Sequence, residues 1–554
     1  MAKLADIRMQ VMWNRLISVV EEQAQTLVRT AFGAATREAG DLSAGVFLPD
    51  GRMVAQAVTG TPGHVNSMAE SVRYFLEEYP REEMHPGDVF LANDPWKTTG
   101  HLNDLTMVTP VFRGKRMVAL FASTVHVVDI GGLGLSADGT QVYHEGLFIP
   151  VVRLVSRGVI DETLLKLVRA NVREPVQVEG DLYSLIACNE VGGRRLLAMM
   201  DEYKLRDIER VSEHIIARSH AAMLAAVAEW PEGSWSYTMT TDGYDAPITL
   251  AGTLGISKDG VDIDFTGTSG IVTNGINVPK SYTDAYTSFG VRCVIGPHIP
   301  NNAGSLSAVR VKAPEGCILN APYPVAVSAR SIVGQMLPDI VFGCLRQARP
   351  GHVPAENSSA LWNLRLAGGQ AIKGIEPSQL QGATRFNVNG FNTGGTGARP
   401  NKDGLSVTSF PSGVRNVAVE IIETLSPVVF WKKEYRPDSG GPGEHRGGLG
   451  QIMEISNGEP APMIISATFD RIVHPARGSG GGHSGGAGCA SLKSGATLRG
   501  FGRQIIPAGD RVVLETPGGG GIGDPKARSR EAVEHDLRNG LITEQQARDA
   551  YGRE

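Results

Sequence analysis

Two histidine–aspartate pairs of the form His-x-x-Asp stand out in the first third of this 554-residue sequence. His101 and Asp104 make the first pair, and His126 and Asp129 make the second. Imidazole nitrogens and carboxylate oxygens together suit zinc, manganese or iron. A single pair is usually a structural hydrogen-bonded pair, whereas two pairs beside glycines and strand ends leave a metal site and a structural role equally open.

Three other residues near these pairs carry side chains that could take part in the same chemistry. Asp41, in the sequence Gly-Asp-Leu-Ser, begins a predicted strand and could supply a further ligand. Glu145 could orient a ligand or act as a base, and the competing interpretation is a surface carboxylate at a strand end. His64, in a predicted loop, could contact a substrate, although a histidine in a loop is more often incidental.

The elements around the two pairs predict that the pairs meet. Residues 105–112 and 116–126 have the composition of β-strands and are joined by a short turn. The loop that carries His101 and Asp104 precedes the first strand, and His126 ends the second. Antiparallel pairing of the two strands would therefore bring both pairs together.

The pattern along the chain predicts an α+β, multidomain protein, with an antiparallel sheet in the N-terminal region, a helical middle and a β-rich, glycine-rich C-terminal region. We expect helices at 7–32, 66–79, 280–296 and 325–348, and a hairpin at 44–57. In the C-terminal region we expect strands at 416–423, 450–455, 461–469 and 510–516. The predicted regions are 1–156 (metal-binding α+β), 157–232 (helical), 233–360 (α/β), 361–528 (β-rich) and 529–554 (a helical tail).

The composition excludes several classes of protein. Hydrophobic residues make up 42% and charged residues 20%, which is normal for a soluble globular protein. The net charge is −5 and no lysine- or arginine-rich block occurs, so we expect no nucleic-acid partner. No apolar run is long enough to span a membrane, and the start lacks the apolar core of a secretory signal. The five scattered cysteines fit free thiols in a reducing compartment, so we expect a cytoplasmic protein.

The motifs resemble those of the hydantoinase B/oxoprolinase family along essentially the whole chain. Individually they are weak, but in this order and over this length they are specific. Two departures occur: Thr98-Thr99-Gly100 stands where many members have Gly-Gly-Thr before the histidine, and Val127 stands where many have a second histidine. The matching segments are 40–43, 93–95, 101–104, 126–132, 144–146, 277–279, 299–304, 436–450 and 516–525.

The resemblance implies a function and a set of roles. It implies that His101, Asp104 and His126 bind a divalent metal, either zinc or manganese with iron as a third candidate, and that Asp41 belongs to the same site. Asp129 and Glu145 are the expected catalytic or orienting carboxylates. The implied partner is a hydantoinase A-type subunit, which binds ATP with magnesium and phosphorylates the oxygen of a cyclic amide.

The sequence is compatible with three functions. The first is a subunit of an ATP-dependent cyclic amide hydrolase, acting on a hydantoin, 5-oxoproline or a lactam. The second is a subunit of an ATP-dependent ketone carboxylase of the acetone or acetophenone type. The third is a non-catalytic binding subunit, in which the histidine–aspartate pairs only hold loops together.

The glycine-rich runs at 478–488 and 517–525 do not form a phosphate-binding loop. Neither has the GxxxxGK[ST] pattern that cradles nucleotide phosphates before a helix, so we assign no nucleotide cofactor to this chain. We expect instead tight turns between strands or a loop that faces the partner. The loop at 436–450 could still reach a nucleotide or substrate across the interface.

Overall fold

A computed structural model describes residues 2–58, 60–369 and 374–553 of the chain. The N-terminal part is built on a seven-stranded sheet in the order β2-β1-β5-β4-β3-β6-β7, and all neighbouring strands run antiparallel. These strands are β1 (Leu42–Phe47), β2 (Met53–Gln56), β3 (Val89–Ala92), β4 (Asp104–Arg113), β5 (Arg116–His126), β6 (Val152–Ser156) and β7 (Val159–Ile160).

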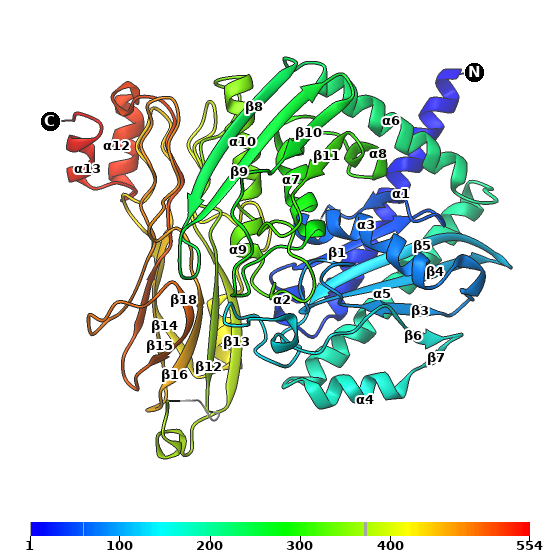
Figure 1. Ribbon diagram of the computed structural model, residues 1–554, viewed down its shortest axis with the longest axis horizontal. Helices are drawn as coiled ribbons and strands as arrows, with labels where there is room; N and C mark the ends of the chain where they lie inside the picture. Colours follow the sequence, from blue (N-terminus) through cyan, green and yellow to red (C-terminus); the bar gives the residue numbers. More distant parts are fainter. Residues whose placement is uncertain (1, 59, 370–373, 554) are drawn as a thin grey trace.

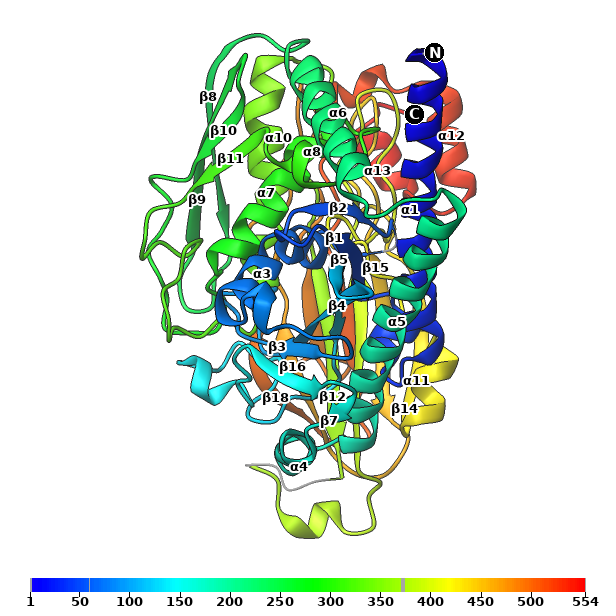
Figure 2. The same cartoon turned by 90° about the vertical axis from the view of Figure 1, so that its right-hand side faces the viewer.

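Helices cover both faces of this sheet because its strands are apolar on both sides. All six residues of β1 are buried, and so are nine of the eleven residues of β5. Helices α1 (Ala2–Thr30) and α5 (Pro175–Glu202) pack together on one face, and α3 (Pro62–Glu78) covers the other (Figures 1 and 2). The expected hairpin and both expected helices of this region are confirmed.

The middle of the chain adds helices and a second sheet. Helices α4 (Glu162–Asn171) and α6 (Glu209–Val227) join α5 in the expected helical segment. A four-stranded sheet then follows in the order β11-β10-β9-β8, with α7 (Lys280–Val294) and α10 (Leu337–Ala348) packed against it and short α8 (Ala303–Leu306) and α9 (Ser331–Gly334) nearby. Its strands are β8 (Gly233–Thr241), β9 (Ile248–Ser257), β10 (Gly260–Asp264) and β11 (Val309–Lys312).

The C-terminal region is a sandwich of two four-stranded sheets, in the orders β13-β12-β16-β18 and β14-β15-β19-β17. The two sheets share one apolar core, which includes Trp362, Met453 and Leu514. Helices α12 (Arg530–Arg538) and α13 (Glu544–Asp549) form the expected helical tail. The strands are β12 (Leu361–Gly368), β13 (Phe386–Thr393), β14 (Val428–Tyr435), β15 (Gln451–Asn457), β16 (Met463–Thr468), β17 (Cys489–Leu492), β18 (Phe501–Ile506) and β19 (Val512–Glu515).

One predicted strand is wrong. Residues 416–423 enter helix α11 (Val419–Leu425), although their Val/Ile content favours a strand. Only Ile422 of this helix is buried, so the helix lies on the surface and buries a single apolar position instead of a strand face. Within the described residues, no helix combines the length and apolar composition needed to cross a membrane.

The glycine-rich segments pack against one another beside the sandwich, close to α12 (Figure 1). Backbone hydrogen bonds join them: the Gly441 N–H donates to the Gly519 oxygen at 2.9 Å, and the Gly518 N–H donates to the Gly486 oxygen at 3.0 Å. A Cβ added at Gly519 would lie 1.9 Å from the backbone oxygen of Thr396. The glycines are therefore needed for close backbone packing, and an expected tight turn is also present, where the Gly482 N–H donates to the Ser479 oxygen at 3.0 Å.

A candidate metal centre between the two halves

The pairing of β4 with β5 places two of the predicted ligands side by side. Asp104 begins β4 and His126 ends β5, and the two residues are direct partners in the antiparallel register. His126 Nδ1 lies 3.0 Å from Asp104 Oδ1. His101 lies three residues before Asp104 in the preceding loop, and its Nε2 lies 2.8 Å from the same oxygen.

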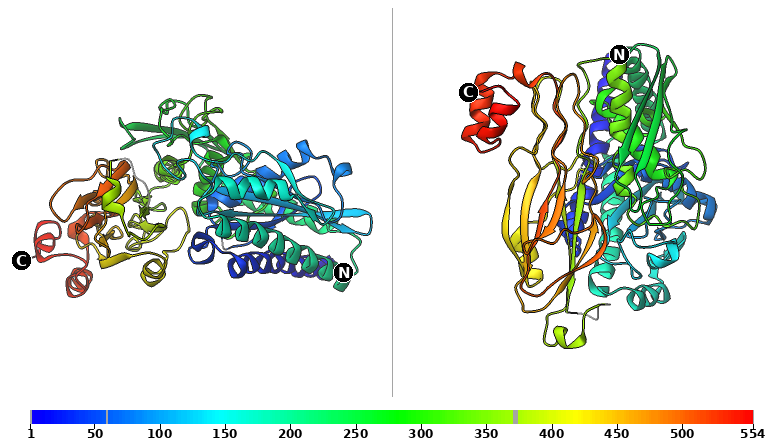
Figure 3. Two further views of the ribbon diagram at one scale, coloured as in Figure 1. Left: turned by 90° about the horizontal axis from the view of Figure 1, so that it is seen from below. Right: turned by 60° about the vertical axis from the view of Figure 1, so that its left-hand side comes forward.

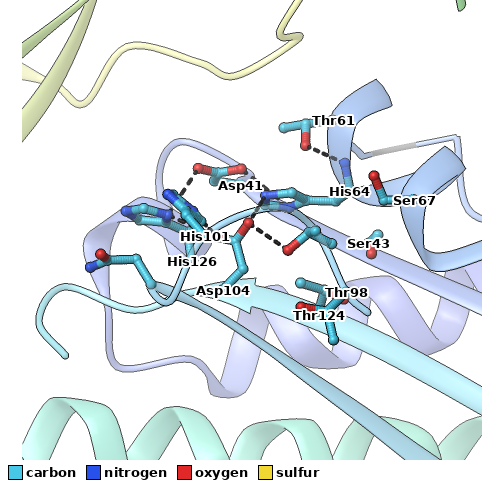
Figure 4. A network of polar contacts seen from close by, with 12 residues as sticks. Asp41, Ser43, Thr61, His64, Ser67, Thr98, His101, Asp104, Thr124 and His126 are labelled. Atoms are coloured by element: carbon cyan, nitrogen blue, oxygen red, sulfur yellow. Dashed lines mark hydrogen bonds and ion pairs between the residues drawn. The ribbon is translucent and has the colours of Figure 1, made fainter. Parts of the chain in front are cut away.

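The three residues form one buried cluster. One ligand atom from each of His101, Asp104 and His126 lies within 4.8 Å of the other two, and all three residues are at most 4% exposed. Figure 4 shows their side chains turned toward one another above the sheet. The structure therefore brings these predicted ligands within reach of a common point.

Asp41 and His64 complete the same pocket. Asp41 Oδ2 lies 4.0 Å from His126 Nδ1, and Asp41 Oδ1 lies 3.4 Å from His64 Nδ1. His64 Nε2 lies 2.9 Å from Asp104 Oδ2, so this imidazole sits between two carboxylates. His64 belongs to the first turn of α3, where Thr61 caps the helix, and the expectation that it lies in a loop is wrong.

The hydrogen bonds of His101 indicate which of its ring nitrogens is free to bind a cation. His101 Nδ1 lies 3.0 Å from the carbonyl oxygen of Ser328, and a carbonyl only accepts, so Nδ1 carries the proton. Burial and the nearby Arg330 charge lower the pKa of His101 to about 3, which leaves its Nε2 as a lone pair. That buried lone pair lacks a hydrogen-bond donor among the described residues and faces a carboxylate oxygen, and this arrangement is repulsive without a cation between them.

The remaining contacts keep Asp104 ionised. Burial alone would raise the pKa of the Asp104 carboxyl, but the adjacent histidines and Arg330 outweigh it and hold this pKa well below its usual value. Arg330 donates to Asp104 Oδ2 at 2.8 Å and stacks over the ring of Tyr282 at 4.1 Å. Thr99 also donates to Oδ2, at 2.7 Å. A side chain at Gly100 would meet Arg330 at 2.6 Å, so the Thr-Thr-Gly sequence fits this packing.

His64 differs from His101 in its charge. Burial opposes its protonation, but the carboxylates of Asp104 and Asp41 outweigh burial and raise the pKa of His64. His101 is therefore held neutral, as a metal ligand must be, whereas protonation of His64 is favoured, which suits a group that carries a proton.

The cavity beside this cluster is small and has walls from both halves of the molecule. Its volume is about 40 Å³. The N-terminal part supplies His101 and His126, and β12 and β13 of the sandwich supply Asn363 and Phe391. The His126 and Phe391 rings lie 6.5 Å apart across it. Seen from below, the sandwich and the N-terminal part form opposite sides of the molecule (Figure 3).

The sequence model of the hydantoinase B/oxoprolinase family matches residues 5–525. The chain belongs to this family. Among relatives, it is 28% identical to 5-oxoprolinase 1 of Arabidopsis thaliana, over 93% of this chain but only 42% of that longer protein. It is 27% identical to the caprolactamase subunit beta of Pseudomonas jessenii, over 99% of this chain and 95% of that subunit.

Two solved structures of this fold are similar over nearly the whole chain. The ATP-dependent caprolactamase from Pseudomonas jessenii superimposes with a TM-score of 0.88 at 25% identity, covering 99% of this chain and 96% of that one. The nucleotide-free acetone carboxylase superimposes with a TM-score of 0.85 at 18% identity, covering 99% of this chain and 79% of that one. The second likeness is a likeness of fold.

The two predicted catalytic carboxylates of this family member lie outside the cluster. Asp129 Oδ1 accepts from Arg173 Nη2 at 2.8 Å and from Arg173 Nε at 3.1 Å, so it anchors the loop that follows β5. Glu145 accepts from the backbone N–H groups of Val327 and Ser328, at 2.6 and 2.8 Å. Because the Ser328 carbonyl accepts from His101, Glu145 fixes the backbone of the residue that orients this imidazole. Burial raises the pKa of Glu145 to about 8.

Proposed function

We propose that this chain is the metal-binding catalytic subunit of an ATP-dependent amidohydrolase that opens a cyclic amide of the hydantoin, 5-oxoproline or lactam type. A hydantoinase A-type partner would first transfer a phosphoryl group from ATP to the amide oxygen. The names of the 5-oxoprolinase and caprolactamase relatives support this class of reaction. The observation that carries the proposal is the unshared His101 lone pair, which converges with Asp104 and His126.

The donor set suits a divalent cation. Two imidazole nitrogens and a carboxylate oxygen fit zinc or manganese, with iron as a third candidate, and Asp41, whose Oδ2 lies 4.0 Å from His126 Nδ1, would add a fourth ligand. Such a cation would lower the pKa of a bound water toward ~7 and so provide a nucleophile at neutral pH. Arg330 and Thr99 orient Asp104 through hydrogen bonds, and the Ser328 carbonyl orients His101.

His64 is the group of the pocket best placed to move a proton. An amide nitrogen must gain a proton as the ring opens, because an amide anion is a poor leaving group. His64 lies between Asp41 and Asp104, whose carboxylates raise its pKa, and it lines the cavity. We assign it the role of proton donor to the ring nitrogen, with the two carboxylates stabilising the protonated imidazole.

A side chain of the sandwich favours an amide over a ketone as the substrate. Asn363 lines the cavity, and its buried Oδ1 has no hydrogen-bond donor among the described residues. A ring N–H of a cyclic amide would satisfy this acceptor, whereas a ketone has no N–H to offer. The resemblance to acetone carboxylase extends to the fold at 18% identity and carries no argument about the substrate.

The test uses His101→Ala and His126→Ala, each purified with the chain that co-elutes with it. We expect both variants to lose stoichiometric metal and ring opening, whereas His144→Ala, at an exposed histidine of the same region, keeps both. Metal is measured by mass spectrometry, and ATP turnover is measured with cyclic amides, with and without bicarbonate. Full metal in both variants would contradict the site, and a requirement for bicarbonate would contradict the hydrolase.

A further inference from the structure

A row of polar side chains crosses the sandwich sheet that faces the N-terminal part. Arg365 on β12 is paired in register with Asn389 on β13 and with Ser466 on β16, and Ser466 is paired with Arg503 on β18. Residues directly opposite each other in a sheet point to the same face. The row therefore faces the same way as Asn363, two residues before Arg365, which lines the cavity.

Three arginines of this region converge on the glycine-rich loop after β5. A Cβ at Gly134 would lie 3.1 Å from Nη2 of Arg365 and 3.8 Å from Nη2 of Arg173, so both guanidinium groups reach the same point. Arg503 Nη2 donates to the backbone oxygen of Leu133 at 3.2 Å. Leu135, two residues after Leu133, lines the cavity beside His101.

The positive charge of this cluster is not balanced. The carboxylate beside the three arginines is Asp129, and both of its contacts to guanidinium nitrogens are with Arg173. Arg365 is partly buried and makes no hydrogen bond or ion pair with any residue that the structure describes. Burial and the charges of Arg173 and Arg503 lower the pKa of Arg365 to about 10, so it remains protonated at neutral pH. A partly buried guanidinium beside two other positive charges favours the binding of an anion.

We infer that Arg365, with Arg173 and Arg503, binds a phosphate group, and that this group is carried by the phosphorylated cyclic amide. The second part rests on the proposed function. Guanidinium groups bind phosphate oxygens through paired, charge-assisted hydrogen bonds. Two residues of an extended strand span about 7 Å, so a phosphate at Arg365 would lie beside a ring held at Asn363 and the candidate metal centre.

The first measurement is calorimetric titration of the full chain with inorganic phosphate. We expect millimolar or tighter binding to the wild type, and binding weakened roughly tenfold or more in Arg365→Gln, because a charged hydrogen bond is lost. Arg310→Gln is the control, since Arg310 pairs with Asp262 on the distant β10–β11 edge and should leave phosphate binding unchanged. Equal binding by Arg365→Gln and the wild type, or no binding by either, would overturn the site.

Thermal unfolding separates a ligand-binding role from a structural one. Because Arg365 has no described partner, its substitution should leave the phosphate-free midpoint unchanged or raise it. Phosphate should raise the midpoint of the wild type and not that of Arg365→Gln. A large loss of stability in phosphate-free buffer would mark Arg365 as a structural residue and would refute the inference.

The source of the phosphate is tested in the complex with its partner. If the activated substrate is the ligand, Arg365→Gln should hydrolyse more ATP for each ring opened, because the phosphorylated amide is held less firmly. Unchanged coupling with weakened phosphate binding would restrict the site to free phosphate and overturn the second part. Tighter binding of ATP than of phosphate at Arg365 would also overturn the second part of the inference. Metal content of His101→Ala tests the proposed function separately, so the two can fail independently.

Discussion

Asp104→Asn is the substitution that the structure makes most informative. The Asp104 side chain is fully buried; its Oδ2 accepts from Thr99 and Arg330 and lies beside His64, and its Oδ1 lies beside His101 and His126. Asparagine has the same shape, so the change removes the charge and leaves the packing intact. The five neighbouring groups are His64 at 2.9 Å, His101 at 2.8 Å, His126 at 3.0 Å, Thr99 at 2.7 Å and Arg330 at 2.8 Å.

Two effects of known size follow from this geometry. The Arg330 side chain is 4% exposed, and removing one partner of a buried ion pair costs about 3–5 kcal/mol. Asparagine can still accept one hydrogen bond through its oxygen, which places the expected loss near 3 kcal/mol in metal-free protein. A neutral amide is also a poor ligand for a divalent cation, so the metal content should fall from one per chain toward zero.

The assay compares urea unfolding and metal content in the wild type, Asp104→Asn and a matched control. The control is Asp129→Asn, because Asp129 is also a buried carboxylate paired with an arginine but lies outside the cluster. We expect the control to lose stability and to keep its metal. Full metal in Asp104→Asn, or equal metal loss in both variants, would refute the assignment of the ligands.

Three further predictions follow. Glu145 keeps its proton in the folded state up to pH about 8, so the free energy of unfolding should fall between pH ~4.5 and ~8, and Glu145→Gln should flatten that slope in urea titrations at several pH values. Gly395→Ala places a Cβ 1.8 Å from a backbone oxygen and should lower the free energy of unfolding, measured in urea, by about 3 kcal/mol, while Gly255→Ala, with its nearest atom at 3.9 Å, should be nearly neutral. Asn363→Leu should raise KM for a cyclic amide roughly tenfold and keep the metal, as steady-state kinetics and metal analysis would reveal.

Local sequence patterns predict most of the N-terminal fold because that fold is made of neighbouring elements. Strands β4 and β5 are joined by a two-residue turn, and their pairing places Asp104 opposite His126. A histidine and an aspartate at the two ends of a hairpin must then meet. The start of α3 was also readable, since Thr61-Pro62 combines a capping residue with a proline in the first turn, and that signal would have placed His64 on a helix.

The rest of the site could not be predicted because its residues are distant in sequence. Arg330 reaches Asp104 across 226 positions, and no local periodicity marks it. Asn363 and Arg365 are ordinary strand residues until the sandwich is packed against the N-terminal part. The role of Glu145 depends likewise on a peptide at 327–328. These contacts arise from tertiary packing, which a pattern of hydrophobic and polar residues does not encode.

The size of the cavity limits what the described arrangement can hold. Pockets for small molecules usually enclose about 300–1,000 Å³, and this one encloses about 40 Å³, which is enough for a cation and a few waters. Phe391 and Val414, which belong to the sandwich, line it together with His126, which belongs to the N-terminal sheet. A cyclic amide would therefore have to lie partly outside this space or displace the side chains that line it. The arginine row needs no such rearrangement, because Arg503 at one end of it is exposed to solvent.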